Sequence, residues 1–242
     1  MNRCIGLLVF ISAFLPGFLA AQDSLSAPIA PMEPPLPPSS MSGGSAPPMT
    51  PFTSSTLLLV YADDESAITV TEPDGTSAVG YIGMEIADGT VIKTGKTGVE
   101  MQMQPNGSVI KLAPDTTFRV DALIGNPGAV TNNFSLLAGK LRMAAAKLSN
   151  PAPAYRISTP TAICGIRGTD FARRYDPGSH EDWLCVLEGV VDFRSPDGKS
   201  AVTVAGGNFV ELGEGFVAKP VPASWVTNNF KDIRFVKARA PK

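Results

Sequence analysis

The chain contains one histidine, His180, which lies in the polar segment Asp176-Pro-Gly-Ser-His-Glu181. A hydrolase of the Ser-His-Asp type needs a buried histidine that a carboxylate orients and that contacts a nucleophile. A histidine in a turn beside proline and glycine is more often solvated. We therefore expect His180 to have no catalytic role, and we expect the chain not to be an enzyme.

The thiols and carboxylates also lack the spacing that catalytic or metal sites require. The segment Cys164-Gly-Ile-Arg167 is shorter than a phosphatase-type thiol loop, so an inert strand cysteine is the better interpretation. The acidic run Asp63-Asp64-Glu65 lacks the spacing and the glycine of a calcium loop. Zinc needs three or four clustered ligands, which the sequence does not supply. We expect neither a metal nor a cofactor.

Composition excludes several classes of protein. Lys and Arg number 20 against 22 Asp and Glu, so no basic surplus is available to neutralise nucleic acid. Hydrophobic residues make up 44% of the chain, while 23 glycines and 22 prolines exclude a coiled coil or a helical bundle. The sequence therefore predicts a chain with a sizeable core and without a nucleic-acid partner.

The N-terminal part predicts export. Residues 1–21 have the charged start, the apolar run and the small residues of a signal peptide, with cleavage between Ala21 and Gln22. The run is shorter than the about 20 residues that span a bilayer, and no later stretch is long enough to do so. Residues 22–56 form a disordered Pro/Ser/Gly-rich linker, because nine prolines occur in residues 27–51. We expect an exported chain without a membrane span, in the periplasm or at the cell surface.

The remaining chain has the period of β-strands. Residues 98–104 alternate apolar and polar side chains, as in a strand with one buried face. Asn106-Gly107 and Pro196-Asp-Gly198 supply hairpin turns between such runs. Residues 57–220 are therefore expected to form an all-β, mostly antiparallel sandwich or roll of about 12–14 short strands, with β-solenoid-like stacking as the alternative. Residues 136–149 contain a competing helical stretch, and residues 221–242 form a basic, solubilising tail.

Cys164 and Cys185 are the thiols that remain after export. An oxidising compartment and an even count favour a disulfide. The expected hairpin argues against it, because a loop over residues 176–181 places Ala172 opposite Cys185. Cys164 then lies about 25 Å farther along a straight strand, whereas a disulfide needs Cα atoms within about 7 Å. We predict two separate, mostly buried thiols and keep the disulfide as the alternative.

Aromatic side chains on exposed strands could bind glycans. Trp183, Trp225 and Tyr155 are the candidates, and packing in or over the core is the better interpretation for each.

Several segments occur in a recognisable order: Pro105-Asn-Gly-Ser-Val-Ile, Leu137-Ala-Gly-Lys-Leu, Ser158-Thr-Pro-Thr-Ala, Arg167-Gly-Thr-Asp-Phe and Leu187-Glu-Gly-Val-Val. Together they resemble the FecR-type periplasmic domain family over roughly residues 86–215. The resemblance implies a β-domain without known chemistry, in which the motif residues are structural. Those residues are Thr159, Pro160, Arg167, Gly168, Thr169, Phe171, Glu188 and Gly189.

The founding member of that family relays a signal from an outer-membrane iron-chelate transporter to a cytoplasmic sigma factor, through a cytoplasmic segment and a membrane helix. We expect this chain to carry the domain without those two parts. It is therefore expected to be an exported, non-enzymatic interaction, sensory or scaffolding module whose partner is an unknown envelope protein or glycan. The alternatives are an auxiliary component of trans-envelope, iron-uptake-type signalling and a glycan- or peptidoglycan-binding domain.

Overall fold

A computed structural model describes residues 54–125, 131–147, 154–222, 230 and 233. The expected signal peptide, its cleavage site, nearly all of the expected linker and Trp225 lie outside the described residues. All the described residues belong to one compact unit, Thr50–Lys242.

The described residues form seventeen strands and two short 3-10 helices, which confirms the expected all-β class. Sheet A has the order β4 (Glu85–Ile86), β1 (Thr56–Ala62), β6 (Val99–Gln104), β7 (Val109–Leu112), the second half of β9 (Asn132–Ala144), β12 (Asp170–Asp176), β13 (Glu181–Glu188), β16 (Asn208–Glu211) and β17 (Lys219–Pro220). Sheet B has the order β3 (Ser77–Val79), β2 (Thr69–Thr71), β5 (Val91–Lys93), β8 (Thr117–Ala122), the first half of β9, β10 (Tyr155–Ser158), β11 (Ile163–Ile166), β14 (Val190–Arg194) and β15 (Ala201–Ala205). The number of strands exceeds 12–14 because five of them have only two or three residues.

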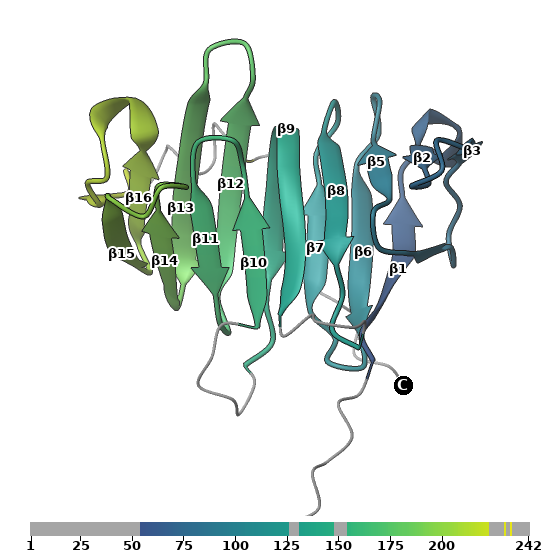
Figure 1. The fold of residues 1–242 in the computed structure, drawn as a ribbon, viewed down its shortest axis with the longest axis horizontal. Helices are drawn as coiled ribbons and strands as arrows, with labels where there is room; N and C mark the ends of the chain where they lie inside the picture. Colours follow the sequence, from purple (N-terminus) through teal and green to yellow (C-terminus); the bar gives the residue numbers. More distant parts are fainter. Residues whose placement is uncertain (1–53, 126–130, 148–153, 223–229, 231–232, 234–242) are drawn as a thin grey trace, which may run out of the picture. The chain divides into compact units, whose positions relative to one another are not determined.

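The strand pairing is antiparallel at every ladder except β9–β10, which is parallel. This pattern favours the expected sandwich or roll over the solenoid-like alternative. In Figure 1, β2 and β3 lie at one end of the strand array, and β15 and β16 lie at the other.

Strand β9 joins the two sheets by bending at Gly139. Residues 132–138 pair with β8 and β10, and residues 139–144 pair with β7 and β12. Gly139 has φ +93°, and a β-carbon there would lie 2.7 Å from Thr116 Cα. A bend with this conformation and this close approach requires glycine. The helical alternative for residues 136–149 is therefore wrong over 136–144, which are strand.

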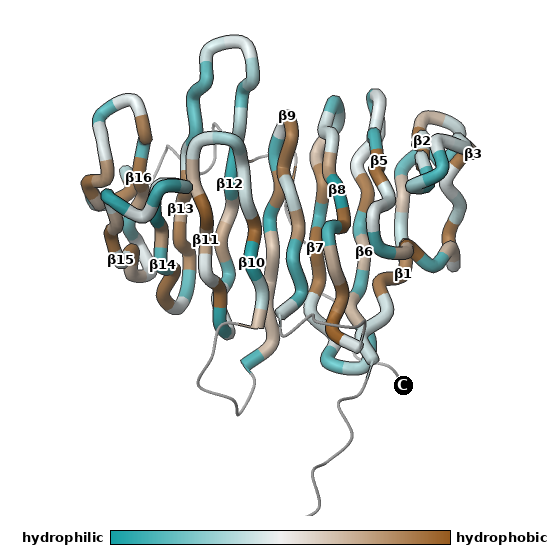
Figure 2. Tube along the Cα trace, in the orientation of Figure 1, coloured by the Kyte–Doolittle hydropathy of each residue, from teal (hydrophilic) through white to brown (hydrophobic). Residues whose placement is uncertain are grey.

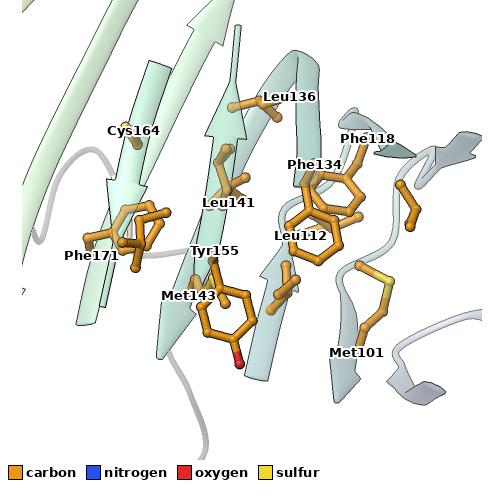
Figure 3. Packing of buried hydrophobic residues seen from close by; sticks show 14 of the residues in the cluster. Met101, Leu112, Phe118, Phe134, Leu136, Leu141, Met143, Tyr155, Cys164 and Phe171 are labelled. Atoms are coloured by element: carbon orange, nitrogen blue, oxygen red, sulfur yellow. The ribbon is translucent and has the colours of Figure 1, made fainter. Parts of the chain in front are cut away.

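The main core lies between the two sheets and follows the predicted alternation, visible along the tubes of Figure 2. In β6, Val99, Met101 and Met103 are buried while the intervening side chains are partly exposed. The rings of Phe118 and Phe134 stack at 5.4 Å within this core (Figure 3). The expected β6–β7 hairpin forms at Asn106-Gly107, where Gly107 has φ +73°.

A second, small core covers the outer face of sheet A. It consists of Ala113, Ala172 and Cys185 from the strands and their loops, with Phe230 and Ile233 from the C-terminal part of the chain. Three small side chains leave room on the sheet for a phenyl ring and a branched aliphatic side chain. The description of residues 221–242 as a solubilising tail is therefore incomplete, because the tail also buries two apolar side chains.

Candidate functional site

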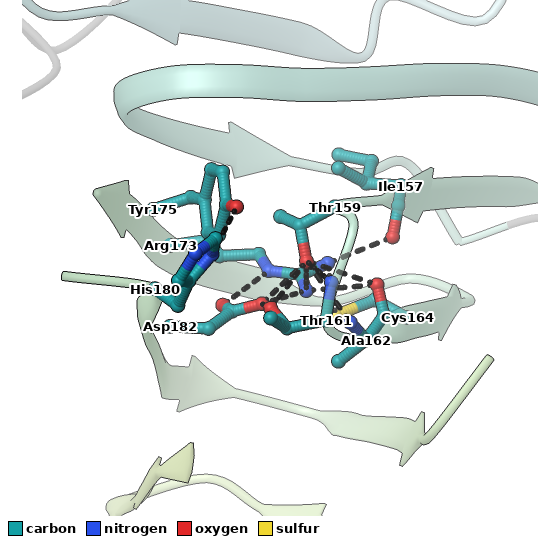
Figure 4. A network of polar contacts seen from close by, with 9 residues as sticks. All are labelled: Ile157, Thr159, Thr161, Ala162, Cys164, Arg173, Tyr175, His180 and Asp182. Atoms are coloured by element: carbon teal, nitrogen blue, oxygen red, sulfur yellow. Dashed lines mark hydrogen bonds and ion pairs between the residues drawn. The ribbon is translucent and has the colours of Figure 1, made fainter. Parts of the chain in front are cut away.

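The dominant polar feature of the described residues is a buried arginine, Arg173, in β12. Its side chain points into the main core, as do those of Phe171 and Tyr175, two residues away on either side. Arg173 is fully buried and forms an ion pair with Asp182 of the neighbouring strand β13 (Figure 4). Nε donates to Asp182 Oδ1 at 2.9 Å, and Nη2 donates to Oδ2 at 2.6 Å. This bidentate geometry is the strong form of an arginine–carboxylate contact.

The remaining donors of Arg173 reach across to sheet B. Nη1 donates to the Ile157 carbonyl of β10 at 2.8 Å and lies 3.2 Å from Cys164 Sγ of β11. Nη2 also donates to Thr159 Oγ1 at 2.8 Å and to the Ala162 carbonyl at 3.0 Å, both in the β10–β11 turn. The guanidinium therefore fastens β12 of sheet A to the β10–β11 hairpin of sheet B. We call this group, with Asp182, Thr159 and Thr161, the arginine clasp.

Asp182, the carboxylate of the clasp, accepts further hydrogen bonds besides those from Arg173. The hydroxyls of Thr159 and Thr161 both donate to Asp182 Oδ2. Burial opposes the charge on Arg173, but the attraction of Asp182 is larger, so the pKa of Arg173 is raised above its ordinary value. Burial likewise raises the pKa of the neighbouring Cys164 thiol to about 12. Each charged or reactive group of the clasp is thus occupied by internal partners or held neutral, an arrangement suited to holding the sheets together.

Sequence reasoning missed Arg173 and Asp182, although it singled out Thr159. The signal was available in the strand period. Arg173 follows Phe171 at the core-facing interval of two, and Asp182 precedes Leu184 in the same way. Opposite charges at buried positions of a predicted hairpin indicate a buried ion pair.

The motif glycines meet where two turns pack together. A β-carbon at Gly189 would lie 3.0 Å from the Gly168 carbonyl oxygen and 3.1 Å from Thr169 Cα. Both glycines have positive φ, +58° at Gly168 and +88° at Gly189. Thr169 Oγ1 donates to the Val190 carbonyl at 2.9 Å and so ties the two turns together.

The other motif residues are spread over the fold. Phe171 belongs to the main core, whereas Pro160, Arg167 and Glu188 are exposed. Glu188 forms an exposed ion pair with Lys147 at 3.4 Å. The motif is thus divided between the clasp, the glycine contact, the core and the surface.

The other sequence candidates have structural partners. His180 has φ +58° in the β12–β13 turn, with Nδ1 3.5 Å from Tyr175 Oη (Figure 4). Asp63 accepts from the Tyr61 hydroxyl, and Asp64 accepts from the Ser66 backbone N–H. Within the described residues, no three His, Cys, Asp or Glu side chains gather where they could hold a metal ion.

The aromatic candidates differ in their environment. Tyr155 is fully buried, and its hydroxyl lies 2.6 Å from Ser108 Oγ. Trp183 lies on the outer face of sheet A, where the guanidinium of Arg174 stacks 4.8 Å from its ring. Tyr155 is thus a core residue, while Trp183 remains at the surface beneath an arginine.

The two cysteines lie in different sheets and different cores. Cys164 of β11 belongs to the main core, and Cys185 of β13 belongs to the small core on the outer face of sheet A. Both are free and buried. The predicted register is confirmed, since Ala172 pairs with Cys185.

An exposed apolar edge lies at the β2–β3 end of the sheets. Val79, Tyr81 and Ile82 are 58%, 56% and 50% exposed, and Val60 and Tyr61 of β1 are exposed as well. The Gly83 N–H donates to the Leu59 carbonyl, which holds this segment against β1. Residues 77–84, Ser-Ala-Val-Gly-Tyr-Ile-Gly-Met, carry no charge.

Comparison with known proteins finds a family match in the central part of the chain. Residues 90–192 match the family described as FecR protein. The resemblance inferred from the sequence motifs is therefore confirmed over this range, which contains the whole clasp and the glycine contact. No curated protein matches the chain.

Two crystal structures of a candidate anti-sigma factor from Parabacteroides distasonis ATCC 8503 are similar to the chain. The structure at 1.65 Å resolution is 14% identical with a TM-score of 0.46, and the match covers 60% of this chain and 63% of that one. The structure at 2.50 Å resolution is 15% identical with a TM-score of 0.42, covering 51% and 55%. The chain thus spans less than two thirds of either. Within the described ranges, no helix is long and apolar enough to cross a membrane.

Proposed function

Because residues 90–192 match the FecR protein family, we propose that the chain is an exported, non-enzymatic interaction module of the cell envelope. The family match carries the proposal. The expected signal peptide supports export, and the expected linker would give the domain reach from an attachment point. The saturated clasp supports a structural rather than catalytic use of the most buried charges.

The exposed apolar edge supports a specific mode of binding. Among the described strands, β3 pairs only with β2, so its other edge offers free backbone donors and acceptors. Natural edge strands are usually protected by short length, charges, proline or bulges. Strand β3 is short, with three residues, but residues 77–84 contain neither a charge nor a proline. Large exposed apolar side chains beside such an edge are typical of strand addition by a partner protein. The partner is an envelope protein that offers an extended, uncharged segment to β3.

Within this function, a role in trans-envelope signalling of the FecR type is the alternative that the family match favours. The module would then sense or transmit partner binding without contacting a sigma factor itself.

The proposal is tested by site-specific photo-crosslinking in cells. A photoreactive residue in place of Tyr81 should give a discrete adduct with one envelope protein, whose crosslinked segment is identified by mass spectrometry. A synthetic peptide of that segment should then slow amide exchange at residues 77–79 of the purified chain. Ile82→Asp should abolish both signals because it places a charge in the apolar edge.

The matched control is Val217→Asp, which adds the same charge at a side chain that is 53% exposed and distant in sequence from the edge. This variant should retain the adduct and the amide protection. Retention of the chain in the cytoplasm, or equal loss in both variants, would contradict the proposal.

A further inference from the structure

Sheet B has a second free edge, which is formed by β15. Among the described strands, β15 pairs with β14 alone, and it lies at the end of the strand array opposite to β3 (Figure 1). Residues 200–207, Ser-Ala-Val-Thr-Val-Ala-Gly-Gly, contain neither a charge nor a proline. With five residues, β15 also has a usual strand length. Short length, charge and proline, which commonly protect an edge, are therefore missing from this strand.

The odd-numbered residues of β15 direct their backbone groups toward the free edge. The Gly206 N–H donates to the Gly189 carbonyl of the β14 side at 2.8 Å. Hydrogen-bonded pairs alternate along an antiparallel ladder, so the even-numbered residues of β15 bond to β14. Residues 201, 203 and 205 therefore face outward. The Asn208 side chain donates to the Ala205 carbonyl at 3.1 Å, which leaves that oxygen a second lone pair.

The sequence of β15 reads the same in both directions, Ala201-Val-Thr-Val-Ala205. If two copies pair antiparallel with Thr203 opposite Thr203, every residue lies opposite a residue of its own type. The outward-facing residues of the two copies then meet in hydrogen-bonded pairs, each of which exchanges two backbone hydrogen bonds. A register shifted by one residue would instead oppose them to residues already bonded to β14.

The side chains of β15 favour the same arrangement. Thr203 is exposed on the outer face of sheet B, and threonines opposite each other stabilise a strand pair. Val204 is buried and Val202 is half-buried on the core side. Val202 of one copy would lie opposite Val204 of the other, so the apolar inner face continues across the junction.

The charges near the edge do not oppose this pairing. Lys199, the charge closest in sequence to β15, would lie opposite the uncharged Gly207 of the second copy. Asp192 pairs with Thr203 across the β14–β15 ladder. Its two copies would be separated by three strand spacings, about 14 Å, which exceeds the screening length of about 8–10 Å at physiological salt. The formal net charge of the whole chain is only −2, so repulsion between copies is weak.

We infer that the chain forms a twofold-symmetric dimer through β15, in which sheet B continues from one copy into the other. Pairing of identical strands about a twofold axis closes after two copies and does not propagate. The interface is small, so the dimer is a reversible one. The inference goes beyond strand addition at β3 and does not depend on it, because β3 and β15 are opposite edges of sheet B.

Cysteine crosslinking of the full exported chain tests the register. Thr203→Cys places two thiols at the twofold axis with Cα atoms about 5.5 Å apart, which a disulfide can bridge, so mild oxidation should give a covalent dimer. Ala201→Cys alone should give none, because its two copies lie about 14 Å apart along the strands. Mixing it with Ala205→Cys should restore the crosslink. The wild-type chain is the control, since its Cys164 and Cys185 are buried.

Sedimentation of the reduced chain tests the dimer without crosslinks. The wild-type chain should show a concentration-dependent monomer–dimer equilibrium. Thr203→Pro removes an outward N–H without affecting the β14 ladder and should weaken the dimer about tenfold or more. Val79→Pro is the matched control. The Gly80 N–H donates to the Ile68 carbonyl, so by the same alternation the Val79 N–H faces the free edge of β3. This variant should leave dimerisation unchanged.

Three results would overturn the inference. The first is a wild-type chain that stays monomeric and a Thr203→Cys variant that does not crosslink. The second is crosslinking of Ala201→Cys alone, which would indicate another register. The third is loss of association in both proline variants, or species larger than a dimer, either of which would indicate head-to-tail pairing of β15 with β3. Melting curves verify that each variant is folded.

Discussion

At the scale of single residues, we expect the largest electrostatic effects on the free energy of unfolding at the arginine clasp. Arg173 and Asp182 are both fully buried and saturated by hydrogen bonds. Removing one partner leaves the other charge buried without compensation, which typically costs about 3–5 kcal/mol. We expect Asp182→Ala to lower the free energy of unfolding by this amount, measured by urea denaturation.

Two further variants distinguish the charge effect from lost packing. The double variant Arg173→Met with Asp182→Leu should lose less stability than Asp182→Ala, because no charge remains buried. Lys96→Ala breaks the exposed pair with Asp115, whose side chains are 86% and 62% exposed, and should cost under about 1 kcal/mol. A double variant as unstable as the single one would contradict this account.

Gly168 is expected to tolerate no side chain. A β-carbon there would lie 2.6 Å from Lys147 Cγ, and its φ is +58°. Gly198 has a similar φ of +71° but open space around it. Gly168→Val should therefore lose about 1–3 kcal/mol more than Gly198→Val, the range for overpacking at a close contact. Equal melting temperatures for the two variants would instead indicate that backbone strain alone governs both sites.

The two thiols make stability depend on alkaline pH. Burial raises the pKa of Cys164 and of Cys185 to about 12, whereas an unfolded thiol ionises near about 8.5. Between these values the unfolded chain loses thiol protons that the folded chain keeps. The stability that the two buried thiols contribute is therefore complete below about pH 8.5 and is lost as pH rises toward 12. Urea midpoints of the reduced chain should fall more steeply with pH than those of a Cys164→Ala, Cys185→Ala variant.

Counting the free thiols tests directly whether Cys164 and Cys185 form a disulfide. Thiol titration of the denatured, non-reduced mature chain should give two free thiols. A value of zero would mean that the cysteines pair after all.

At the scale of elements, the sequence predicted local pairing better than long-range pairing. The β6–β7 turn at Asn106-Gly107 and the Ala172–Cys185 register follow from turn chemistry and counting along adjacent strands. The division of β9 between two sheets could not be predicted in this way. Alternation shows which face of a strand is buried but does not identify its neighbours, and Gly139 marks a bend without indicating which strands meet there.

The candidate site was likewise predictable only where its residues belong to a local motif. Thr159 and the two turn glycines were found because they belong to the motif that resembles the FecR family. The clasp depends on β10–β11 lying opposite β12–β13, which is tertiary information.

The C-terminal segment is expected to protect Cys185. Phe230 and Ile233 pack over Ala113, Ala172 and Cys185. Phe230→Ala should therefore accelerate the reaction of native Cys185 with a thiol reagent while leaving Cys164, in the main core, unreactive. The stability loss should stay at or below the about 3–5 kcal/mol of a Phe deletion in a central core. Val217→Ala is the control. Equal reactivity of Cys185 in both variants would contradict the expectation that the C-terminal segment protects Cys185.

At the scale of the described domain, the two sheets are joined in three independent ways. Strand β9 belongs to both, the clasp connects β12 to the β10–β11 hairpin, and one apolar core fills the space between them. Separating the sheets would break a continuous strand, expose a buried charge and open the core at once. Such coupling is expected to make unfolding a single cooperative transition.

Native-state amide exchange in low urea measures this coupling. The amides of Met101 in sheet A and Val120 in sheet B should exchange with the same opening free energy, because neither sheet opens alone. The amide of Ala78 in β3 should exchange by a local opening of lower free energy, since its strand is short and exposed. Gly139→Ala strains the bend that joins the sheets and should lower the opening free energy at Met101 and Val120 equally. A drop at Val120 alone would mean that sheet B unfolds as a separate unit and that β9 and the clasp do not couple the sheets.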